Sequence, residues 1–337
     1  MTQRVLHVLP HPGGGGETYV RMLQGMAGYA FETSFLAPSA DRPASVPINA
    51  LAAQWAAREV DLVHVHGEVA AAACLPTLAL KRAVVTLHGL HLLRRSQGVA
   101  REAAAASLGL IVRAASRTIC VADSEAADVV AAVGDWARPR LAVIPNGVPL
   151  PALPRAEERA SARAQLGLDQ NALVGAWLGA LDAHKDPLTA ARAARGLPLV
   201  LLFAGEGSLK NQVEREGGAS VRLVGQLADT RRILAAADFF VLASQREGLS
   251  FALLEAMAMG LAPVVSDAAG NVEAVADAGI IVPYGDVGGF AAAFRRLMET
   301  GLRLALARRA RERIAAKFAV DAMRERTRQV YAAAIAA

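Results

Sequence analysis

Short apolar runs alternate along the chain with segments whose hydrophobic residues recur at helical spacing. In the first half, the apolar runs predict strands at 4–10, 31–36, 62–65, 83–87, 117–121 and 141–144. Segments 48–58, 101–115 and 125–133, which lie between them, are predicted as helices. Continuous apolar strands that alternate with helices indicate a parallel sheet buried on both faces. This half is therefore predicted to be a doubly wound α/β domain.

A proline-rich segment separates this series from a second one. The stretch PNGVPLPALPRAEERA carries four prolines between Pro145 and Pro154, which is typical of a linker. We therefore expect domains at 1–150 and 151–337, and the last helix could pack back on the first domain. Ligands of such sheets bind beyond the carboxyl ends of the strands, so we expect a cleft between the domains. The second half is predicted to contain strands at 173–178, 199–203, 221–224, 239–242, 262–265 and 280–282, then a long basic helical stretch over 287–335.

Composition narrows the class of protein. The chain has 337 residues, of which 54% are hydrophobic, and this content excludes a disordered protein. No apolar run approaches the roughly 18 residues that span a bilayer, and the first residues lack the pattern of a secretory signal. The two cysteines, Cys74 and Cys120, stand in apolar stretches and are predicted to be buried small residues. Together these features predict a cytoplasmic protein without a disulfide framework or a cysteine zinc site.

The net charge of +5 is unevenly distributed. Nine basic residues against three acidic ones lie between Gly301 and Arg328. Basic helical faces can bind nucleic acid or anionic lipid, although a solvated face is the commoner explanation. Aromatic residues that could stack on bases are only 5% of the chain, so no nucleic-acid partner is expected. A second basic cluster, which we keep as a candidate membrane-surface segment, consists of Arg94, Arg95, Arg101, Arg113 and Arg117.

A tetraglycine, Gly13 to Gly16, lies between the first predicted strand and the first predicted helix. Exposed backbone amides at a helix N-terminus suit a phosphate or the close approach of a substrate. The stretch is not a dinucleotide fingerprint, which would need a glycine at Thr18, and it lacks the GK[ST] of a Walker loop. A tight turn without a ligand is the alternative.

Two glutamates in REGLSFALLEAMAMG form the most informative pattern. Glu247 is predicted in the loop before a helix, and Glu255 about two turns inside that helix. The free amides of the first helical turn would lie between the two carboxylates. Such an arrangement can hold paired hydroxyls on the carboxylates while the amides receive a phosphate.

Several histidines could suggest a metal site. His64 and His66 share one face of a predicted strand, and His88 and His91 follow the next strand. No carboxylate or cysteine stands at ligand spacing, so we interpret them as core or cleft histidines. Ser124 precedes a predicted helix, and its hydroxyl could serve as the N-cap of that helix.

These motifs occur in an order that carries a family resemblance. HPGGGGET, VVTLHG, VIPNGV, LLFAGEGSLKNQVE and LAAADFFVLASQREGLSFALLEAMAMG follow one another over nearly the whole chain. The sequence resembles the retaining nucleotide-sugar glycosyltransferases of glycosyltransferase family 4. The resemblance implies the GT-B fold, in which two Rossmann-like domains face a central cleft. It also implies acceptor binding by the N-terminal domain and nucleotide-sugar binding by the C-terminal domain.

The resemblance assigns a role to particular residues. It implies that Glu255 binds the ribose hydroxyls, that Glu247 holds the donor sugar, and that Lys185 neutralises the diphosphate. Where the family has an arginine, this chain has Ala180, so Lys185 would act with Arg246 or His184 as candidate helpers. The other implied contacts are His88 with the donor sugar; Gly248, Leu249, Ser250 and Phe251 with the sugar and its phosphate; Gly205, Gly207, Gly225 and Gln226 with the base; and Gly15 and Gly16 with the diphosphate and the acceptor.

The implied reaction moves a sugar from a UDP- or GDP-sugar to a hydroxyl with retention of the anomeric configuration. It would proceed by front-face attack, with domain closure and without a metal or other cofactor. Glycan or glycolipid acceptors are expected, in polysaccharide, lipopolysaccharide or glycolipid synthesis at the inner face of the plasma membrane. A sugar-nucleotide epimerase or a phosphorylase of the same fold is one alternative. An inactive nucleotide-sugar-binding protein, consistent with Ala180, is another. The donor sugar, the base, the acceptor and the oligomeric state remain open.

Overall fold

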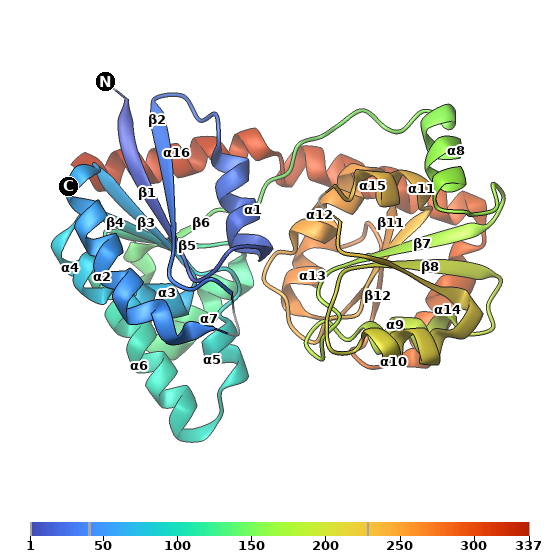
Figure 1. Cartoon of the computed structure of the whole chain (residues 1–337), viewed down its shortest axis with the longest axis horizontal. Coiled ribbons are helices and arrows are strands. Elements are labelled where there is room, and N and C mark those ends of the chain that lie inside the picture. Colours follow the sequence, from blue (N-terminus) through green and yellow to red (C-terminus); the bar gives the residue numbers. More distant parts are fainter. Residues whose placement is uncertain (1, 40–41, 228, 337) are drawn as a thin grey trace. The chain divides into compact units, whose positions relative to one another are not determined.

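The computed structural model describes residues 2–39, 42–227 and 229–336 and divides into two compact units (Figure 1). The first unit comprises the residues up to Gly147 together with those from Val320 onward, and the second comprises Val148–Ala319. The division falls close to the expected boundary at 150. The last helix belongs to the first unit rather than to the second.

The first unit is built on a six-stranded parallel sheet in the order β2-β1-β3-β4-β5-β6. Alternate side chains of β1 face opposite layers of helices: Leu6 and Val8 join an apolar core, whereas His7 faces the other side. Helices α1 and α16 cover the face that carries His7 and His64 (Figure 1). The strands are β1 (Gln3–Leu9), β2 (Tyr29–Phe35), β3 (Leu62–His66), β4 (Ala83–Thr86), β5 (Arg117–Cys120) and β6 (Leu141–Val143). The α-helices are α1 (Gly14–Leu23), α2 (Val46–Ala56), α3 (Glu68–Ala73), α4 (Leu75–Leu80), α5 (His91–Arg95), α6 (Gly98–Ala114), α7 (Asp123–Val133) and α16 (Val320–Ala336).

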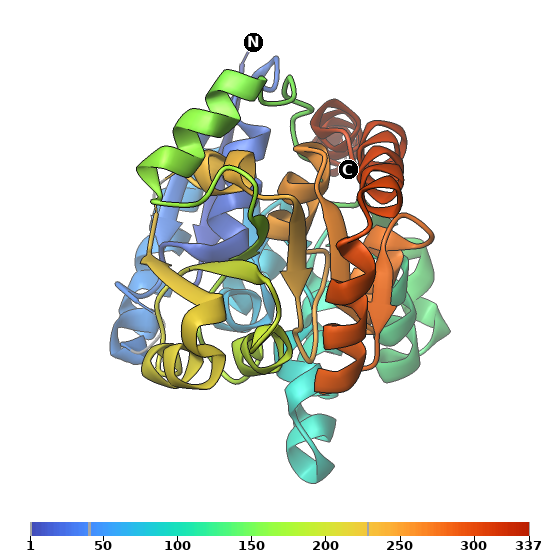
Figure 2. The ribbon, with the colours of Figure 1, turned by 90° about the vertical axis from the view of Figure 1, so that its right-hand side faces the viewer.

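The second unit has a six-stranded parallel sheet in the order β12-β11-β10-β7-β8-β9. If β7 is counted as the first strand and the sheet is read from its β9 edge, the order is 3-2-1-4-5-6. This is the order of dinucleotide-binding sheets. Helices lie on both faces of the sheet (Figure 2). Its strands are β7 (Leu173–Leu178), β8 (Leu199–Ala204), β9 (Val221–Gly225), β10 (Phe239–Leu242), β11 (Ala262–Ser266) and β12 (Ile280–Val282). Its α-helices are α8 (Ala156–Gln165), α9 (Pro187–Ala194), α10 (Lys210–Gly217), α11 (Arg231–Ala236), α12 (Phe251–Ala258), α13 (Ala269–Val275), α14 (Val287–Leu297) and α15 (Thr300–Lys317).

The predicted stretch over 287–335 is helical, but it is divided into three helices, α14, α15 and α16. At the second break the buried Phe318 ends α15, and its carbonyl accepts a hydrogen bond from the Val148 amide at 2.9 Å. This break is the point at which the chain leaves the second unit for the first. None of the helices in the described part of the chain is both long and apolar enough to cross a membrane.

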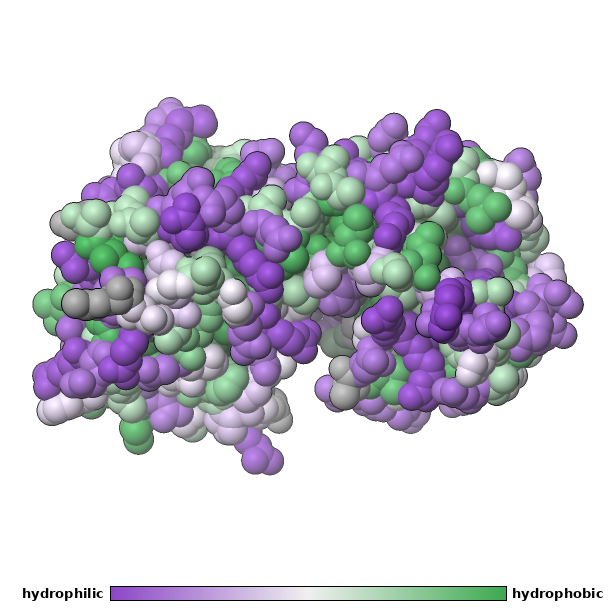
Figure 3. Space-filling view, turned by 90° about the horizontal axis from the view of Figure 1, so that it is seen from above, coloured by the Kyte–Doolittle hydropathy of each residue, from purple (hydrophilic) through white to green (hydrophobic). Residues whose placement is uncertain are grey.

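Several arginines of the basic C-terminal run bind backbone carbonyls at the ends of other helices. Arg313 donates to the carbonyls of Glu273 and Ala274, and Arg324 to those of Met22 and Gln24. Carbonyls at helix C-termini lack partners within the helix, so a guanidinium there supplies the missing donors. In the view of Figure 3, hydrophilic residues are interspersed with hydrophobic ones over the visible surface. Part of the run is therefore structural rather than a free cationic face.

Cys74 and Cys120 are buried and free, as predicted. Burial raises the pKa of the Cys74 thiol to about 11, and it also raises the pKa of Cys120. Both therefore remain protonated at neutral pH and pack as small apolar residues.

Candidate active site

The second unit places a lysine and a glutamate where its strand order reverses. β7 and β10 are neighbours in the sheet; the loop after β7 carries Lys185 and the loop after β10 carries Glu247. The Lys185 Nζ lies 2.6 Å from the Glu247 Oε1, which also accepts a hydrogen bond from the Ser244 hydroxyl at 2.7 Å. The Glu247 side chain is only 6% exposed and that of Lys185 is 31% exposed. The strand-order reversal is the point at which such sheets bind ligands.

Local backbone contacts fix the position of Lys185. The Asp182 carboxylate accepts hydrogen bonds from the amides of His184 at 2.9 Å and Lys185 at 3.0 Å. The His184 carbonyl accepts a hydrogen bond from the Gln245 amide at 3.0 Å, which ties the loop after β7 to the loop after β10. The lysine is thus held against Glu247 by both of the loops involved.

The loop that follows Glu247 leads directly into α12. The Ser250 hydroxyl accepts a hydrogen bond from the Leu253 amide at 3.5 Å and caps the helix. Glu255 is the fifth residue of α12 and is half-buried, so it lies just over one turn inside the helix rather than the predicted two. A Cβ at Gly270 would overlap the carbonyl oxygen of Gly248, so only glycine allows α13 to pack against this loop.

The glycines predicted near the base lie on the adjoining loops. A Cβ at Gly205 would overlap the carbonyl oxygen of Gly179, so the loop after β8 packs directly on the loop after β7. The Gly205 amide donates to the carbonyl of Gly225, the last residue of β9, at 2.9 Å. Gly207 packs in the same way on Leu181, and Gln226 is exposed. All these residues lie at the carboxyl edge of the sheet that carries Lys185.

The first unit has a cavity of about 480 Å³ at the carboxyl ends of its own strands. The cavity is lined by Gly13 to Gly16, by His66 and His88, and by Arg95. Gly13 and Gly14 have φ values of 83° and 75°, and Gly15 and Gly16 form the first turn of α1. The Glu17 carboxylate accepts a hydrogen bond from the Gly13 amide at 2.5 Å. The structure thus brings the predicted loop glycines and His88 to one cavity.

The backbone around His88 is strained, and two buried glutamates hold it. His88, Gly89 and Leu90 have φ values of 59°, 114° and 50°, and residues other than glycine rarely adopt such positive values. The fully buried Glu125 carboxylate accepts hydrogen bonds from the amides of Gly89 and Val121, and burial raises its pKa to about 7.

Glu68 holds the next part of the same loop. Its carboxylate accepts hydrogen bonds from the amides of Leu92 at 2.7 Å and Leu93 at 3.2 Å, and burial raises its pKa. Neither glutamate was predicted from the sequence, although Glu125 stands in the segment VADSEA, beside buried apolar residues.

His64 and His66 are fully buried core residues, as predicted, and the ring of a third buried histidine, His7, packs against both of them. The ring nitrogens of His7, His64 and His66 lie within 4.8 Å of one another. His64 already bonds the Tyr331 hydroxyl at 2.6 Å and the Thr86 hydroxyl at 2.7 Å. His66 bonds a histidine through each of its ring nitrogens. Hydrogen bonds within the protein therefore engage both ring nitrogens of His64 and of His66, whereas the Nε2 of His7 has no partner among the described residues.

The prediction that Ser124 is an N-cap is wrong. The N-cap of α7 is Ala122, and Ser124 lies in the first turn of the helix. The helix starts two residues earlier than a Ser124 cap would allow, and the Glu125 carboxylate then accepts a hydrogen bond from the buried amide of Gly89.

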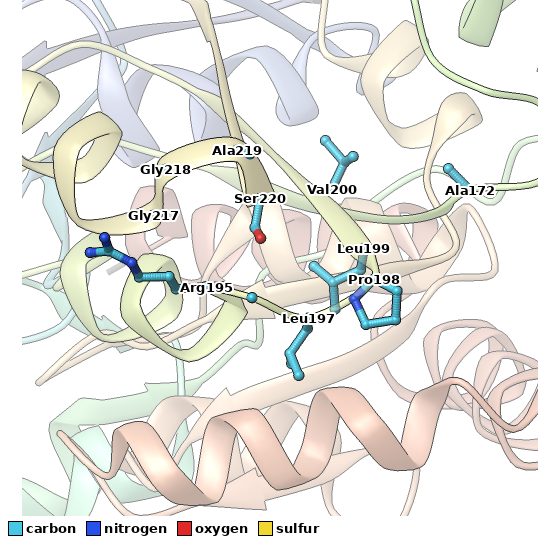
Figure 4. A pocket seen from close by; sticks show the side chains of 11 residues that line it. Ala172, Arg195, Leu197, Pro198, Leu199, Val200, Gly217, Gly218, Ala219 and Ser220 are labelled. Atoms are coloured by element: carbon cyan, nitrogen blue, oxygen red, sulfur yellow. The ribbon is translucent and has the colours of Figure 1, made fainter.

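A second hollow, of about 560 Å³, lies at the opposite edge of the sheet of the second unit (Figure 4). Its lining comes from the segments that precede β7, β8 and β9, including Pro198, Leu199 and Ser220. Arg195 is the one ionisable side chain among its lining residues. This hollow lies at the amino ends of the strands, away from Lys185 and Glu247, and offers no constellation for chemistry.

Comparison with known proteins places the chain in a family. The sequence model of Glycosyltransferase Family 4 matches residues 7–151, and that of Glycosyl transferases group 1 matches residues 174–300. A UDP-Gal:alpha-D-GlcNAc-diphosphoundecaprenol alpha-1,3-galactosyltransferase of Escherichia coli is 29% identical over 208 residues, covering 57% of this chain and 54% of that protein. A D-inositol 3-phosphate glycosyltransferase of Streptomyces avermitilis is 31% identical over 285 residues, covering 74% of this chain and 61% of its own length. The chain thus spans little more than half the length of these relatives.

Solved structures show the same fold. A sucrose-phosphate synthase of Thermosynechococcus elongatus superposes with a TM-score of 0.84 at 21% identity, over 98% of both chains. The Anabaena protein HepE, in complex with UDP and glucose, superposes with a TM-score of 0.82 at 19% identity, over 97% of this chain and 98% of its own. The architecture is the GT-B fold, with two Rossmann-like domains. The chain belongs to the glycosyltransferases of family 4, and carries a group 1 domain in its second unit.

Proposed function

We propose that the protein is a retaining glycosyltransferase that moves a sugar from a UDP- or GDP-sugar to a hydroxyl of a glycan or glycolipid. The observation that carries the proposal is the contact between Lys185 and Glu247 at the strand-order reversal of the second unit. The names of the relatives, which include a galactosyltransferase that acts on a diphosphoundecaprenol-linked sugar, support envelope polysaccharide, lipopolysaccharide or glycolipid synthesis.

Breaking the anomeric bond places negative charge on the departing diphosphate. Lys185 supplies a cation for that charge, and the positive N-terminal end of α12, beside Gly248 to Phe251, adds to the stabilisation. In this proposal the protein's own groups neutralise the diphosphate, and no metal or other cofactor takes part. Ala180 removes one donor that the family usually has, so the remaining cation carries more of the stabilisation.

The two glutamates would divide the binding of the donor. Glu247, buried and paired with Lys185, would hold hydroxyls of the sugar next to the diphosphate. Glu255 would hold the ribose hydroxyls, and the loops at Gly205, Gly207, Gly225 and Gln226 would hold the base. The leaving phosphate oxygen would accept the proton of the attacking hydroxyl, so that the new bond forms on the face from which the diphosphate leaves.

Nucleotide binding tests the proposal directly. The melting temperature is measured with UDP, GDP, ADP and their sugar conjugates, for the wild type and Glu255→Ala. A nucleotide at about 100 times its Kd stabilises the protein by about 2.7 kcal/mol, and we expect this shift for one base, lost in Glu255→Ala. The control is Glu312→Ala, which changes an exposed glutamate of α15 and should keep the shift.

Product analysis then separates the alternatives. Transfer requires release of nucleoside diphosphate that depends on an added acceptor. A donor sugar that is converted without any acceptor would instead identify an epimerase. Binding with no release in the presence of an acceptor pool would identify a nucleotide-sugar-binding protein.

We also propose that part of the basic segment 94–117 docks on an anionic membrane surface. The docking region is the tip formed by α5 and the start of α6. Val99 is 81% exposed and Leu92 is 40% exposed at this tip, and Arg95 and Arg101 are exposed beside them. Apolar insertion together with cationic residues favours binding to anionic lipid. Arg94 and Arg113 contribute less, because Arg94 pairs with Asp128 at 2.8 Å and Arg113 stacks on Trp136.

Flotation with vesicles that contain anionic lipid checks this docking. We expect binding that weakens as salt screens the charges, and a loss of binding in Val99→Glu. The matched control is Leu304→Glu, since Leu304 is an apolar residue of α15 that is 62% exposed. Equal flotation of all three proteins, or flotation insensitive to salt, would remove the tip from the proposal.

A further inference from the structure

Three histidines of the first unit form a continuous chain of hydrogen bonds. The Nδ1 of His7 lies 2.8 Å from the Nε2 of His66, and the Nδ1 of His66 lies 2.9 Å from the Nε2 of His88. The three residues come from β1, from the end of β3 and from the loop after β4. Only the outer end of the chain, at His66 and His88, lines the cavity of this unit. The inner end, at His7, is fully buried beside Phe31.

If the three rings are neutral, the hydrogen bonds of this histidine chain must all donate in the same direction. A neutral imidazole donates from one nitrogen and accepts at the other, so His66 can receive a proton from one neighbour only. Burial lowers the pKa of His7 and of His88 to about 3, and it lowers that of His66 well below its usual value. The hydrogen bonds therefore run either from His7 outward to His88 or from His88 inward to His7.

The buried end of the chain selects the direction. The Nε2 of His7 has no hydrogen-bond partner among the residues that the structure describes. With an inward chain this atom would be a buried N–H without an acceptor, which native structures rarely tolerate. If the hydrogen bonds donate outward, the His7 Nε2 carries a lone pair and no hydrogen, and the N–H groups of His7 and His66 both have acceptors. The outward direction leaves the proton of His88 on its Nδ1.

We propose that His7 and His66 are positioning residues that fix His88 as a neutral imidazole with its hydrogen on Nδ1. His88 then contacts its ligand as a hydrogen-bond donor toward oxygen and cannot serve as a general base. This inference rests on the proposed function for the identity of the ligand, a hydroxylated sugar. The hydrogen-bond chain itself stands on the three rings alone. Glu125, which binds the Gly89 amide, holds the backbone of the same loop in place.

The protonation state of His88 is measurable without any activity. In protein labelled with ¹⁵N-histidine, nitrogen shifts distinguish a protonated from a bare ring nitrogen. We expect protonated Nδ1 and bare Nε2 for His88, and the same pattern for His66 and His7. A proton on the Nε2 of His88 would overturn the proposed direction. Shifts of His7 and His66 that change when a chelator is added would replace the chain with a metal site.

Two pairs of variants separate positioning from mere packing. The terminal amide of asparagine occupies the place of the histidine Nδ1, so His66→Asn retains a donor toward His88 and His66→Leu does not. By the same geometry, His7→Asn retains the donor toward His66 and His7→Phe does not. We expect the Leu and Phe variants to lose the single tautomer of His88 and to lower kcat/KM by about ten-fold or more, and the Asn variants to restore both.

The matched control removes a polar atom from the same cluster but outside the chain. Tyr331→Phe takes away the hydroxyl that bonds His64 and leaves His7, His66 and His88 untouched. It should keep the His88 tautomer and the activity. A His66→Leu variant with an unchanged His88 tautomer would refute the proposal. The expected tautomer effects in a protein that transfers no sugar would support the chain and refute only the proposed function.

Discussion

Lys185→Met is expected to lower kcat by about 10²–10³-fold while the protein remains folded. The lysine is the charged group that the structure places against Glu247 at the strand-order reversal, and Ala180 supplies no charge that could replace it. Removing one donor that stabilises developing negative charge typically costs a factor of this size. The loss should fall mainly on kcat rather than on the Kd for nucleotide, since charge on the diphosphate grows as the bond breaks.

The same substitution leaves the Glu247 carboxylate with the Ser244 hydroxyl but without its cation. Breaking a fully buried ion pair costs about 3–5 kcal/mol, and the 31% exposure of Lys185 reduces that penalty. A double substitution, Lys185→Met with Glu247→Gln, removes the unpaired charge and should recover stability but not turnover. This pair of variants distinguishes a loss of catalysis from a loss of folding.

The chain offers a matched control because it has only four lysines. Lys317→Met changes an exposed lysine at the end of α15 in the same unit and should leave kcat within about two-fold, as surface changes usually do. Steady-state rates of diphosphate release and nucleotide Kd are measured for all the variants. Near-normal turnover in Lys185→Met would show that the diphosphate charge is stabilised elsewhere.

The first unit is expected to lose stability steeply as the pH falls below about 6.5. His7, His64, His66 and His88 are held neutral because burial disfavours their charged forms, and their pKa values are all lowered, to about 3 for His7 and His88. The unfolded chain binds protons at these residues below about pH 6.5, and the folded unit does not. Stability therefore rises with pH in this window and is lost on acidification.

The size of the effect follows from the number of protons. Each histidine contributes about 1.4 kcal/mol per pH unit between its unfolded and folded pKa values. Glu125 acts in the opposite direction, because its pKa is raised to about 7 and its neutral form is favoured as the pH falls toward 4.5. Glu68 opposes the histidines in the same sense. The net slope should be about 3–4 kcal/mol per pH unit near pH 5.5, enough to unfold an ordinary domain within two or three units.

Denaturant titrations between pH 5 and 8 measure this slope. Trp177 reports on the second unit, so a Trp177→Phe background leaves Trp55 and Trp136 as reporters of the first unit. His7→Asn should lower the slope by about 1.4 kcal/mol per pH unit, because it removes one proton-binding site of the unfolded chain. His11→Asn is the control. An unchanged slope in His7→Asn would mean that the histidine is already protonated in the folded unit, contrary to this account.

The sequence by itself determined the strands, their parallel arrangement and the family. Buried parallel strands need continuous apolar runs, and these runs are visible in the sequence. Strands β7, β10 and β12 begin and end at the predicted residues. The loop glutamate, the lysine and the glycine loops were also predictable, because their local motifs carry the resemblance. The two breaks in the C-terminal helical stretch were not, since they depend on which unit each segment packs against.

What only the tertiary structure decided are the contacts between side chains far apart in the chain. His7 and His66 are 59 positions apart, Lys185 and Glu247 are 62 apart, and no local pattern pairs them. Strand order places β1 beside β3 and β7 beside β10, and alternation along each strand then decides which faces carry the histidines. Glu125 likewise became a support of the His88 loop only because β4 lies next to β5. Short-range sequence preferences determine elements, whereas packing of the sheet determines which polar groups share a site.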